Sequence, residues 1–176
     1  MTVPAATWEQ VRQRAGFSCE FCGVTETDTG GHLSVDHFQP KTKGGTDNLD
    51  NLVYCCFRCN QYKRDYWRSS PQEPPLWNPR QERANQHFIE LDDGHLHALT
   101  TVGALTIRRL RLNRAPLVAW RVRRRQRIEE LRLLERYRDL IQLLAHLHRE
   151  KASLLEEQQG LLAEQRALLR LLLGGD

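Results

Sequence analysis

The sequence lacks any apolar run near the ~20 residues that a membrane-spanning helix needs. Its first five residues also lack the basic region and apolar core that mark a secretory signal peptide. Its five cysteines are an odd number, and four of them form two Cys-x-x-Cys pairs, which is not the pattern of a disulfide framework. We therefore expect a soluble, cytoplasmic protein without a membrane segment, whose cysteines bind metal in a reducing compartment.

Acidic residues are missing from one stretch of an otherwise balanced chain. The formal net charge is +4, from 26 basic and 22 acidic residues, but residues 108–127 contain nine arginines and no Asp or Glu. A block of one sign suggests a polyanionic partner, most simply nucleic acid, although alone it is also typical of a solvated helix face. The candidate nucleic-acid-binding residues in this block are Arg121, Arg123, Arg124 and Arg125.

The length and patterning predict an α+β chain in three segments. A chain of 176 residues suits one compact domain with an appendage. Alternation and turn residues predict short strands over 32–38 and 52–55 and a helix from residue 57 to about 66. Asp92-Asp93-Gly94 between two apolar stretches predicts a β-hairpin, with a helix after it. The predicted segments are residues 1–68, 69–115 and 116–176.

The last segment carries a heptad repeat of leucine, which predicts a coiled coil and a homodimer formed through it. A neighbouring row is almost as apolar, whereas a third row is half polar. Two alternatives are an amphipathic helix folded back on the globular part and a helical hairpin that turns at residues 158–160. The first row consists of Leu133, Leu140, Leu147, Leu154, Leu161 and Leu168.

The two cysteine pairs predict a structural zinc site. Thiolate is the soft ligand that such sites use, and a gap of two residues lets both sulfurs of a pair face one ion. Buried thiols without metal are the alternative, which the paired spacing disfavours. The fifth cysteine, Cys55, is expected to fill the core as a small apolar residue. The predicted zinc ligands are Cys19, Cys22, Cys56 and Cys59.

Residues 17–63 resemble the core of the HNH endonuclease family in its four-cysteine form. The matching pieces between the cysteine pairs are Val35-Asp36-His37, Gly44-Gly45 and Asn51-Leu52, and Asn60 directly follows the last cysteine. The resemblance implies a ββα-metal fold in which a hairpin and a helix hold one catalytic divalent ion. Downstream pieces extend it to roughly two thirds of the chain, as a hairpin–helix supplement packed on the core.

The resemblance also implies a role for each residue of the site. His37 is the expected general base, because an imidazole accepts a proton from water near neutral pH. Asp36 and Asn60 are the expected ligands of Mg²⁺ or Mn²⁺, and Asn51 would fix the loop that orients His37. Neighbouring residues of a regular strand point to opposite faces, so a site shared by Asp36 and His37 requires a bend. The residues expected to touch flanking phosphates are Lys63 and Arg64.

These observations predict a metal-dependent endonuclease that hydrolyses phosphodiester bonds in DNA, with RNA left open as a substrate. One alternative is a non-catalytic, zinc-stabilised module that binds phosphates through the arginine block. Another is a platform whose main function is dimerisation or partner docking through the C-terminal helix. At the site itself, the alternative is an ordinary salt bridge at the end of a strand involving Asp36 and His37.

Overall fold

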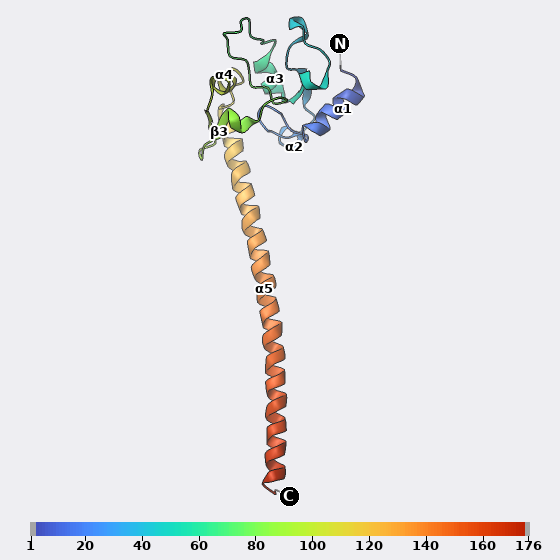
Figure 1. Cartoon of the computed structure of the whole chain (residues 1–176), viewed down its shortest axis with the longest axis vertical. Helices are drawn as coiled ribbons and strands as arrows, with labels where there is room; N and C mark the ends of the chain where they lie inside the picture. Colours follow the sequence, from blue (N-terminus) through green and yellow to red (C-terminus); the bar gives the residue numbers. More distant parts are fainter. Residues whose placement is uncertain (1–2, 175–176) are drawn as a thin grey trace. The chain divides into compact units, whose positions relative to one another are not determined.

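The computed structural model describes residues 3–174, which divide into two compact units at residues 124 and 125. Helix α5 begins in the first unit and forms nearly all of the second (Figure 1). Short 3-10 helices lie at Lys41–Lys43, Leu49–Asn51 and Ala84–Gln86. The helices are α1 (Ala5–Arg14), α2 (Glu26–Thr29), α3 (Phe57–Lys63), α4 (Thr101–Arg109) and α5 (Ala115–Leu172), and the strands are β1 (Ser34–His37), β2 (Leu52–Cys55), β3 (Phe88–Glu90) and β4 (Leu96–Ala98).

Strands β1 and β2 form an antiparallel pair that leads into α3. The register places Ser34 opposite Cys55 and His37 opposite Leu52. All four residues of β2 are buried, including Cys55, whose predicted place in the core is confirmed. Helix α3 ends at Lys63 because Arg64 adopts a φ of 52°, which does not continue a helix. The predicted strands and helix are thus confirmed: β2 has the predicted bounds, whereas β1 and α3 are shorter than predicted.

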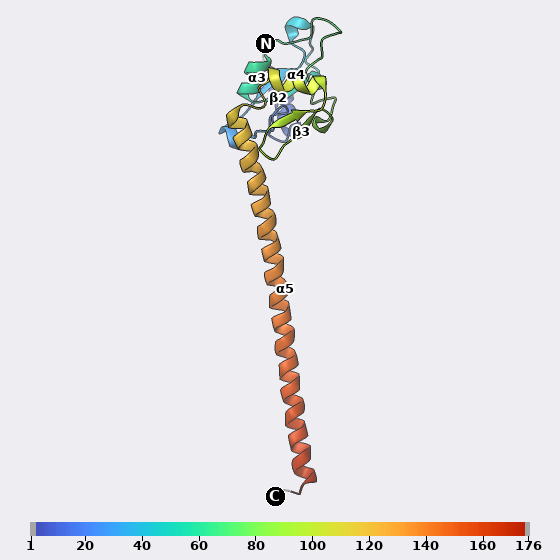
Figure 2. The same cartoon turned by 90° about the vertical axis from the view of Figure 1, so that its left-hand side faces the viewer.

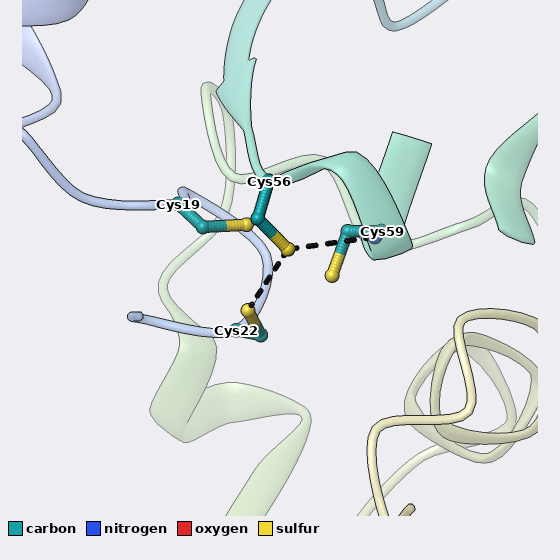
Figure 3. Close-up of side chains that lie close together, drawn as sticks. All are labelled: Cys19, Cys22, Cys56 and Cys59. Carbon is teal, nitrogen blue, oxygen red and sulfur yellow. Dashed lines mark hydrogen bonds between the residues drawn. The ribbon is translucent and has the colours of Figure 1, made fainter. Parts of the chain in front are cut away.

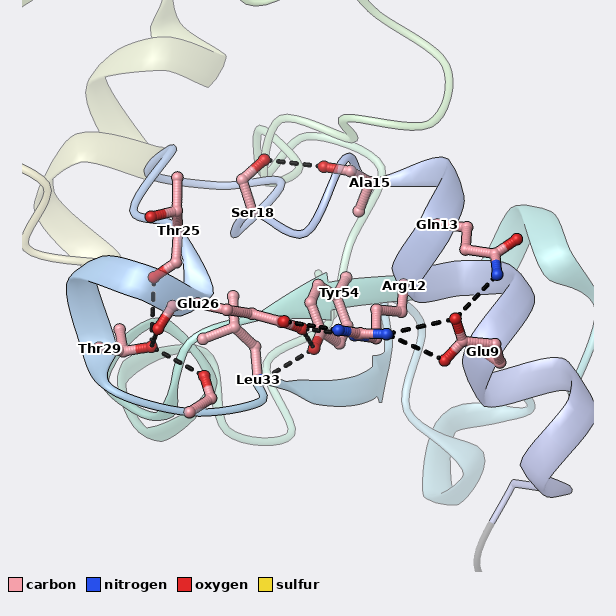
Figure 4. Close-up of polar contacts among 11 residues, drawn as sticks. Glu9, Arg12, Gln13, Ala15, Ser18, Thr25, Glu26, Thr29, Leu33 and Tyr54 are labelled. Atoms are coloured by element: carbon pink, nitrogen blue, oxygen red, sulfur yellow. Dashed lines mark hydrogen bonds and ion pairs between the residues drawn. The ribbon is translucent and has the colours of Figure 1, made fainter.

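A partly buried ionic contact joins α1, α2 and β2 (Figure 4). Arg12 donates from Nε and Nη2 to the two carboxylate oxygens of Glu26, at 2.6 and 2.8 Å. The hydroxyl of Tyr54 donates to the same carboxylate. This bidentate pair connects residues that are far apart in sequence, and it fixes α2 beside the sheet.

Strands β3 and β4 form the hairpin that the Asp-Asp-Gly turn predicts. Gly94 has a φ of 83°, and a Cβ there would lie 2.7 Å from the carbonyl oxygen of Val118, so only glycine fits this turn. Trp77 packs edge-on against both Phe21 and Phe88, with ring centroids 6.5 and 5.3 Å apart. One aromatic residue therefore contacts both the cysteine-rich segment and the hairpin.

The second unit is helical without interruption from Arg125 to Leu172, and the helix is continuous in both views (Figures 1 and 2). It passes through residues 158–160 as helix, so the helical-hairpin alternative is wrong. The first leucine row is 49–64 % exposed along its length. The coiled coil and the folded-back helix both stay predictions. No helix among residues 3–174 combines the length and apolar character needed to cross a membrane.

Candidate active site and metal centre

Four cysteines from two separated segments converge at the start of α3 (Figure 3). Their sulfur atoms all lie within 4.8 Å of one another, and Cys22 Sγ is 3.7 Å from Cys56 Sγ. Sulfurs bound tetrahedrally to one zinc ion are about 3.8 Å apart, given Zn–S bonds of about 2.3 Å. All four side chains are buried, and all four thiols are free of disulfides. The predicted ligands are therefore brought together in a cluster that could hold a zinc ion.

The four thiols differ in their tendency to carry negative charge: burial raises the pKa of Cys19 and the hydrogen bond with Cys19 raises that of Cys59, whereas the pKa of Cys22 and of Cys56 is lowered. Hydrogen bonds from the thiols of Cys19, Cys22 and Cys59 hold the pKa of Cys56 well below its ordinary value. Burial alone would lower the pKa of Arg114, but negative charge on Cys59, Cys22 and Cys56 outweighs burial and raises that pKa. A guanidinium beside the sulfurs would offset part of the charge of a zinc–thiolate centre.

The Asp36 carboxylate on β1 faces α3, where it meets a buried ammonium group. The Lys63 side chain is only 1 % exposed, and its Nζ donates to Asp36 Oδ2 at 2.8 Å, to the carbonyl of His37 at 2.6 Å and to that of Arg64 at 3.3 Å. These acceptors match the three protons of an ammonium group. Lys63 was predicted to contact phosphate, but the structure places it inside, where it connects α3 to β1.

His37 reaches a different set of partners from its neighbour on the strand. Its Nε2 lies 2.7 Å from Asp47 Oδ1, and Asp47 Oδ2 accepts from the ammonium of Lys41 at 2.7 Å. The hydrogen bonds from Lys41 and His37 lower the pKa of Asp47. Asp47 could not be singled out from the sequence, because it lies in a turn-rich loop where aspartate is common.

Asn51 holds the loop that connects β1 to β2. Its Oδ1 accepts from the backbone of Gln39 at 2.8 Å, and its Nδ2 donates to the carbonyls of Thr46 at 2.8 Å and Gln39 at 3.1 Å. A Cβ on Gly45 would lie 1.8 Å from the Gln39 carbonyl oxygen, so the loop closes this tightly only around glycine. The amide of Asn51 therefore closes the same loop that carries Asp47.

Asn60 lies on α3, one residue after the last cysteine, and is half-buried. It precedes the buried Lys63 by three positions on α3, and Arg64 follows directly after the helix. The structure thus brings Asp36, Lys63 and α3 together. Among residues 3–174, no hydrogen bond joins the Asn60 side chain to Asp36.

The predicted arginines fall into different environments. Arg121 is buried and donates to the carbonyls of Gly94 at 3.0 Å and Leu112 at 2.8 Å, so its guanidinium is used inside the first unit. Arg124 pairs with Glu90 at 2.8 Å on the surface, and Arg123 is exposed. Arg125 belongs to the second unit, and Arg64 is exposed after α3.

Residues 19–65 match the model of the family described as HNH endonuclease, which confirms the resemblance seen in the core; the resemblance of the downstream residues stays a prediction. Comparisons with curated proteins and with solved structures found no match. The matched segment holds both cysteine pairs and the Asp-His, Asn51 and Asn60 positions. An HNH endonuclease domain indicates nuclease activity in general and a nucleic acid as substrate.

Proposed function

We propose that this HNH endonuclease domain hydrolyses phosphodiester bonds in DNA, with His37 as the general base. The observation that carries the proposal is the restraint on the imidazole. Asp47 contacts Nε2, and the Asn51 amide closes the loop on which Asp47 lies. A histidine held in this way at a strand end can accept a proton from water in a fixed direction.

The contact with Asp47 supports a choice of which nitrogen of His37 acts as the base. If Nε2–H donates to the Asp47 carboxylate, Nδ1 is left unprotonated and takes the proton of the attacking water. The water oxygen then bonds to phosphorus, the bond from phosphorus to a sugar oxygen breaks, and that oxygen takes a proton from solvent water as it leaves. Asp47 stabilises the imidazolium that forms, so we assign it a positioning role that the sequence did not indicate.

Asp36 and Asn60 are the proposed ligands of a catalytic Mg²⁺ or Mn²⁺ ion. A carboxylate and an amide oxygen are the hard donors that these ions prefer, and both groups come from the elements that adjoin at Lys63. The ion would supply charge neutralisation at the phosphate. Lys63 occupies Asp36 Oδ2 and holds the carboxylate toward α3, which leaves Oδ1 for a cation.

The cysteine cluster is the proposed structural zinc site. It connects the segment after α1 with the first turn of α3, so a bound ion would hold that helix against the remainder of the core. Arg64, Arg123, Arg124 and Arg125 are the proposed contacts to DNA phosphates. A salt-dependent affinity with little sequence preference follows from such contacts.

A second copy of this chain is the proposed partner of α5. Leucines of six successive heptads stay about half exposed, and a parallel or antiparallel coiled coil would remove them from water. Two linked nuclease domains would then be able to cut both strands of a duplex.

Cleavage of supercoiled plasmid with Mg²⁺ or Mn²⁺ tests the nuclease directly. We expect wild type to nick or linearise DNA, EDTA to abolish cleavage, and His37→Ala to slow it by about 10²-fold or more. His97→Ala, which removes an exposed imidazole from β4, is the matched control and should cleave like wild type. Equal cleavage by His37→Ala would refute the assigned base. DNA binding without cleavage by folded, zinc-loaded protein would favour the non-catalytic module.

A further inference from the structure

Three arginines from separate positions in the chain line one pocket beside α3. Arg64 directly follows α3, Arg109 is the last residue of α4, and Arg111 lies in the turn after α4. With Gln61 and Tyr62 they surround a cavity of about 260 Å³. None of these five lining residues carries a carboxylate, so the pocket concentrates positive charge.

Aromatic rings, rather than acids, support two of the guanidinium groups. Arg109 lies over the ring of Tyr66 and Arg111 over the ring of Tyr62, each at 5.0 Å from the ring centroid. Arg109 Nη2 donates to the carbonyl of Lys63 at 3.3 Å, whereas its Nε is buried without a hydrogen-bond partner. Stacking fixes the plane of a guanidinium and leaves its N–H edge to an outside acceptor.

The backbone at two of the three arginines is unfavourable for a residue with a side chain. Arg64 has a φ of 52° and Arg111 a φ of 47°, in the left-handed region where glycine is the usual residue. Arginine at both positions costs free energy that glycine would avoid. Strain of this kind that converges on one charged pocket is the signature of a functional constraint.

We propose that Arg64, Arg109 and Arg111 bind one phosphate of the nucleic-acid backbone, next to the phosphate that is cut. The inference rests on the proposed nuclease function, because the pocket adjoins the candidate site through α3. Arg64 follows Asn60 by one helical turn, and its amide donates to the Asn60 carbonyl at 2.9 Å. Guanidinium forks bind phosphate oxygens in pairs, and an anion between three arginines relieves their mutual repulsion.

Binding of a labelled DNA duplex to the full chain, followed by fluorescence anisotropy over a series of salt concentrations, tests the pocket. The background is His37→Ala, so that cleavage does not interfere. Relative to that background, Arg64→Gln/Arg111→Gln should bind at least about tenfold more weakly, and the slope of log K against log salt should fall by about 1, as expected for one lost phosphate contact. Arg136→Gln/Arg138→Gln removes the same charge from the second unit and should change affinity less than twofold.

Two further variants separate the pocket from general charge and from folding. Arg111→Lys keeps the charge but loses the fork, and should recover only part of the affinity. Arg111→Gly removes the free-energy cost of the positive φ together with the charge. This variant should have a higher melting temperature but bind DNA more weakly. Two results together would overturn the proposal and assign the pocket to free phosphate. Inorganic phosphate, but not chloride at equal ionic strength, would raise the melting temperature, and the double variant would bind DNA as tightly as its background.

The outcomes of this experiment and of the cleavage assay are independent. Unchanged affinity and salt slope in the folded double variant, while wild type cleaves DNA, would overturn the pocket and leave the nuclease in place. The double variant could instead bind DNA more weakly and with less salt dependence while wild type does not cleave. That result would support a nucleic-acid phosphate site and remove the nuclease assignment.

Discussion

The two units of this chain differ in what determines the environment of a side chain. In residues 1–124, the groups of the candidate site are defined by partners far away in sequence, as Lys63 is by Asp36 across 27 positions. In residues 125–172, leucines of different heptad rows are similarly exposed, such as Leu140 at 51 % and Leu143 at 53 %. The comparison teaches that a substitution in the first unit breaks particular contacts, whereas we expect one in the second to act only through the proposed assembly. The predictions below test that difference by their effect on the unfolding of the first unit.

Loss of a zinc ligand should have the largest effect. Cys59→Ser should abolish zinc binding and the cooperative unfolding of residues 1–124, because structural zinc contributes about 10–16 kcal/mol in small zinc-binding peptides, as much as the whole stability of a domain. Zinc content and near-ultraviolet circular dichroism measure this. Cys55→Ala removes a buried thiol outside the cluster and should keep the zinc. Wild type that folds with no bound zinc would contradict the prediction.

Removing the charge partner of Lys63 should have the next largest effect on the free energy of unfolding. Asp36→Ala leaves a buried ammonium without its counter-charge, and we expect a loss of about 3 kcal/mol in the free energy of unfolding, measured with urea. The Asp36 side chain is 24 % exposed, so the reverse change, Lys63→Met, should cost less. The double variant should be more stable than Asp36→Ala alone. A cost for Asp36→Ala below about 0.5 kcal/mol would show that the pair does not hold α3.

Much of the first unit could be predicted from the sequence where the signal is local. The cysteine spacing predicted the cluster, and Asp-Asp-Gly predicted the β3–β4 hairpin. Lysine is almost always exposed, so nothing local indicated that Lys63 is buried. Asp47 was missed for a related reason, since its proposed role depends on contact with a histidine ten positions away.

The arginine block shows the same limit. Its charge was visible in the sequence, but its division into a buried Arg121, a surface pair at Arg124 and a pocket residue at Arg111 depends on tertiary contacts. In the second unit the leucine period predicted a helix. It left the partner of that helix undetermined, because a period specifies a face but not what covers it.

Acid should weaken the first unit moderately through the carboxylate that joins α1, α2 and β2. The hydrogen bond from Arg12, followed by that from Tyr54, lowers the pKa of Glu26 to about 2. An unfolded glutamate titrates near about 4.3, so this stabilisation is complete above about pH 5 and is lost as the pH falls toward 2. When the melting temperature is measured between pH 7 and 2.5, it should therefore decrease below about pH 5. Glu26→Gln should be less stable at pH 7 and should lose less on acidification; parallel curves for the two proteins would count against the assignment.

Substitutions in the leucine row of α5 should have the smallest effect on the first unit and yet change the mass of the protein in solution. Leu147→Glu/Leu154→Glu places charges in the proposed seam, so a dimeric wild type should become monomeric by light scattering. The unfolding free energy of residues 1–124 should change by less than about 0.5 kcal/mol, because these side chains are exposed and belong to the other unit. Leu143→Glu is the control, since Leu143 is equally exposed but its heptad row is mostly charged. A monomeric wild type, or dissociation by the control variant, would remove the second copy as the partner of α5, while a destabilised first unit would show that the two regions are not independent.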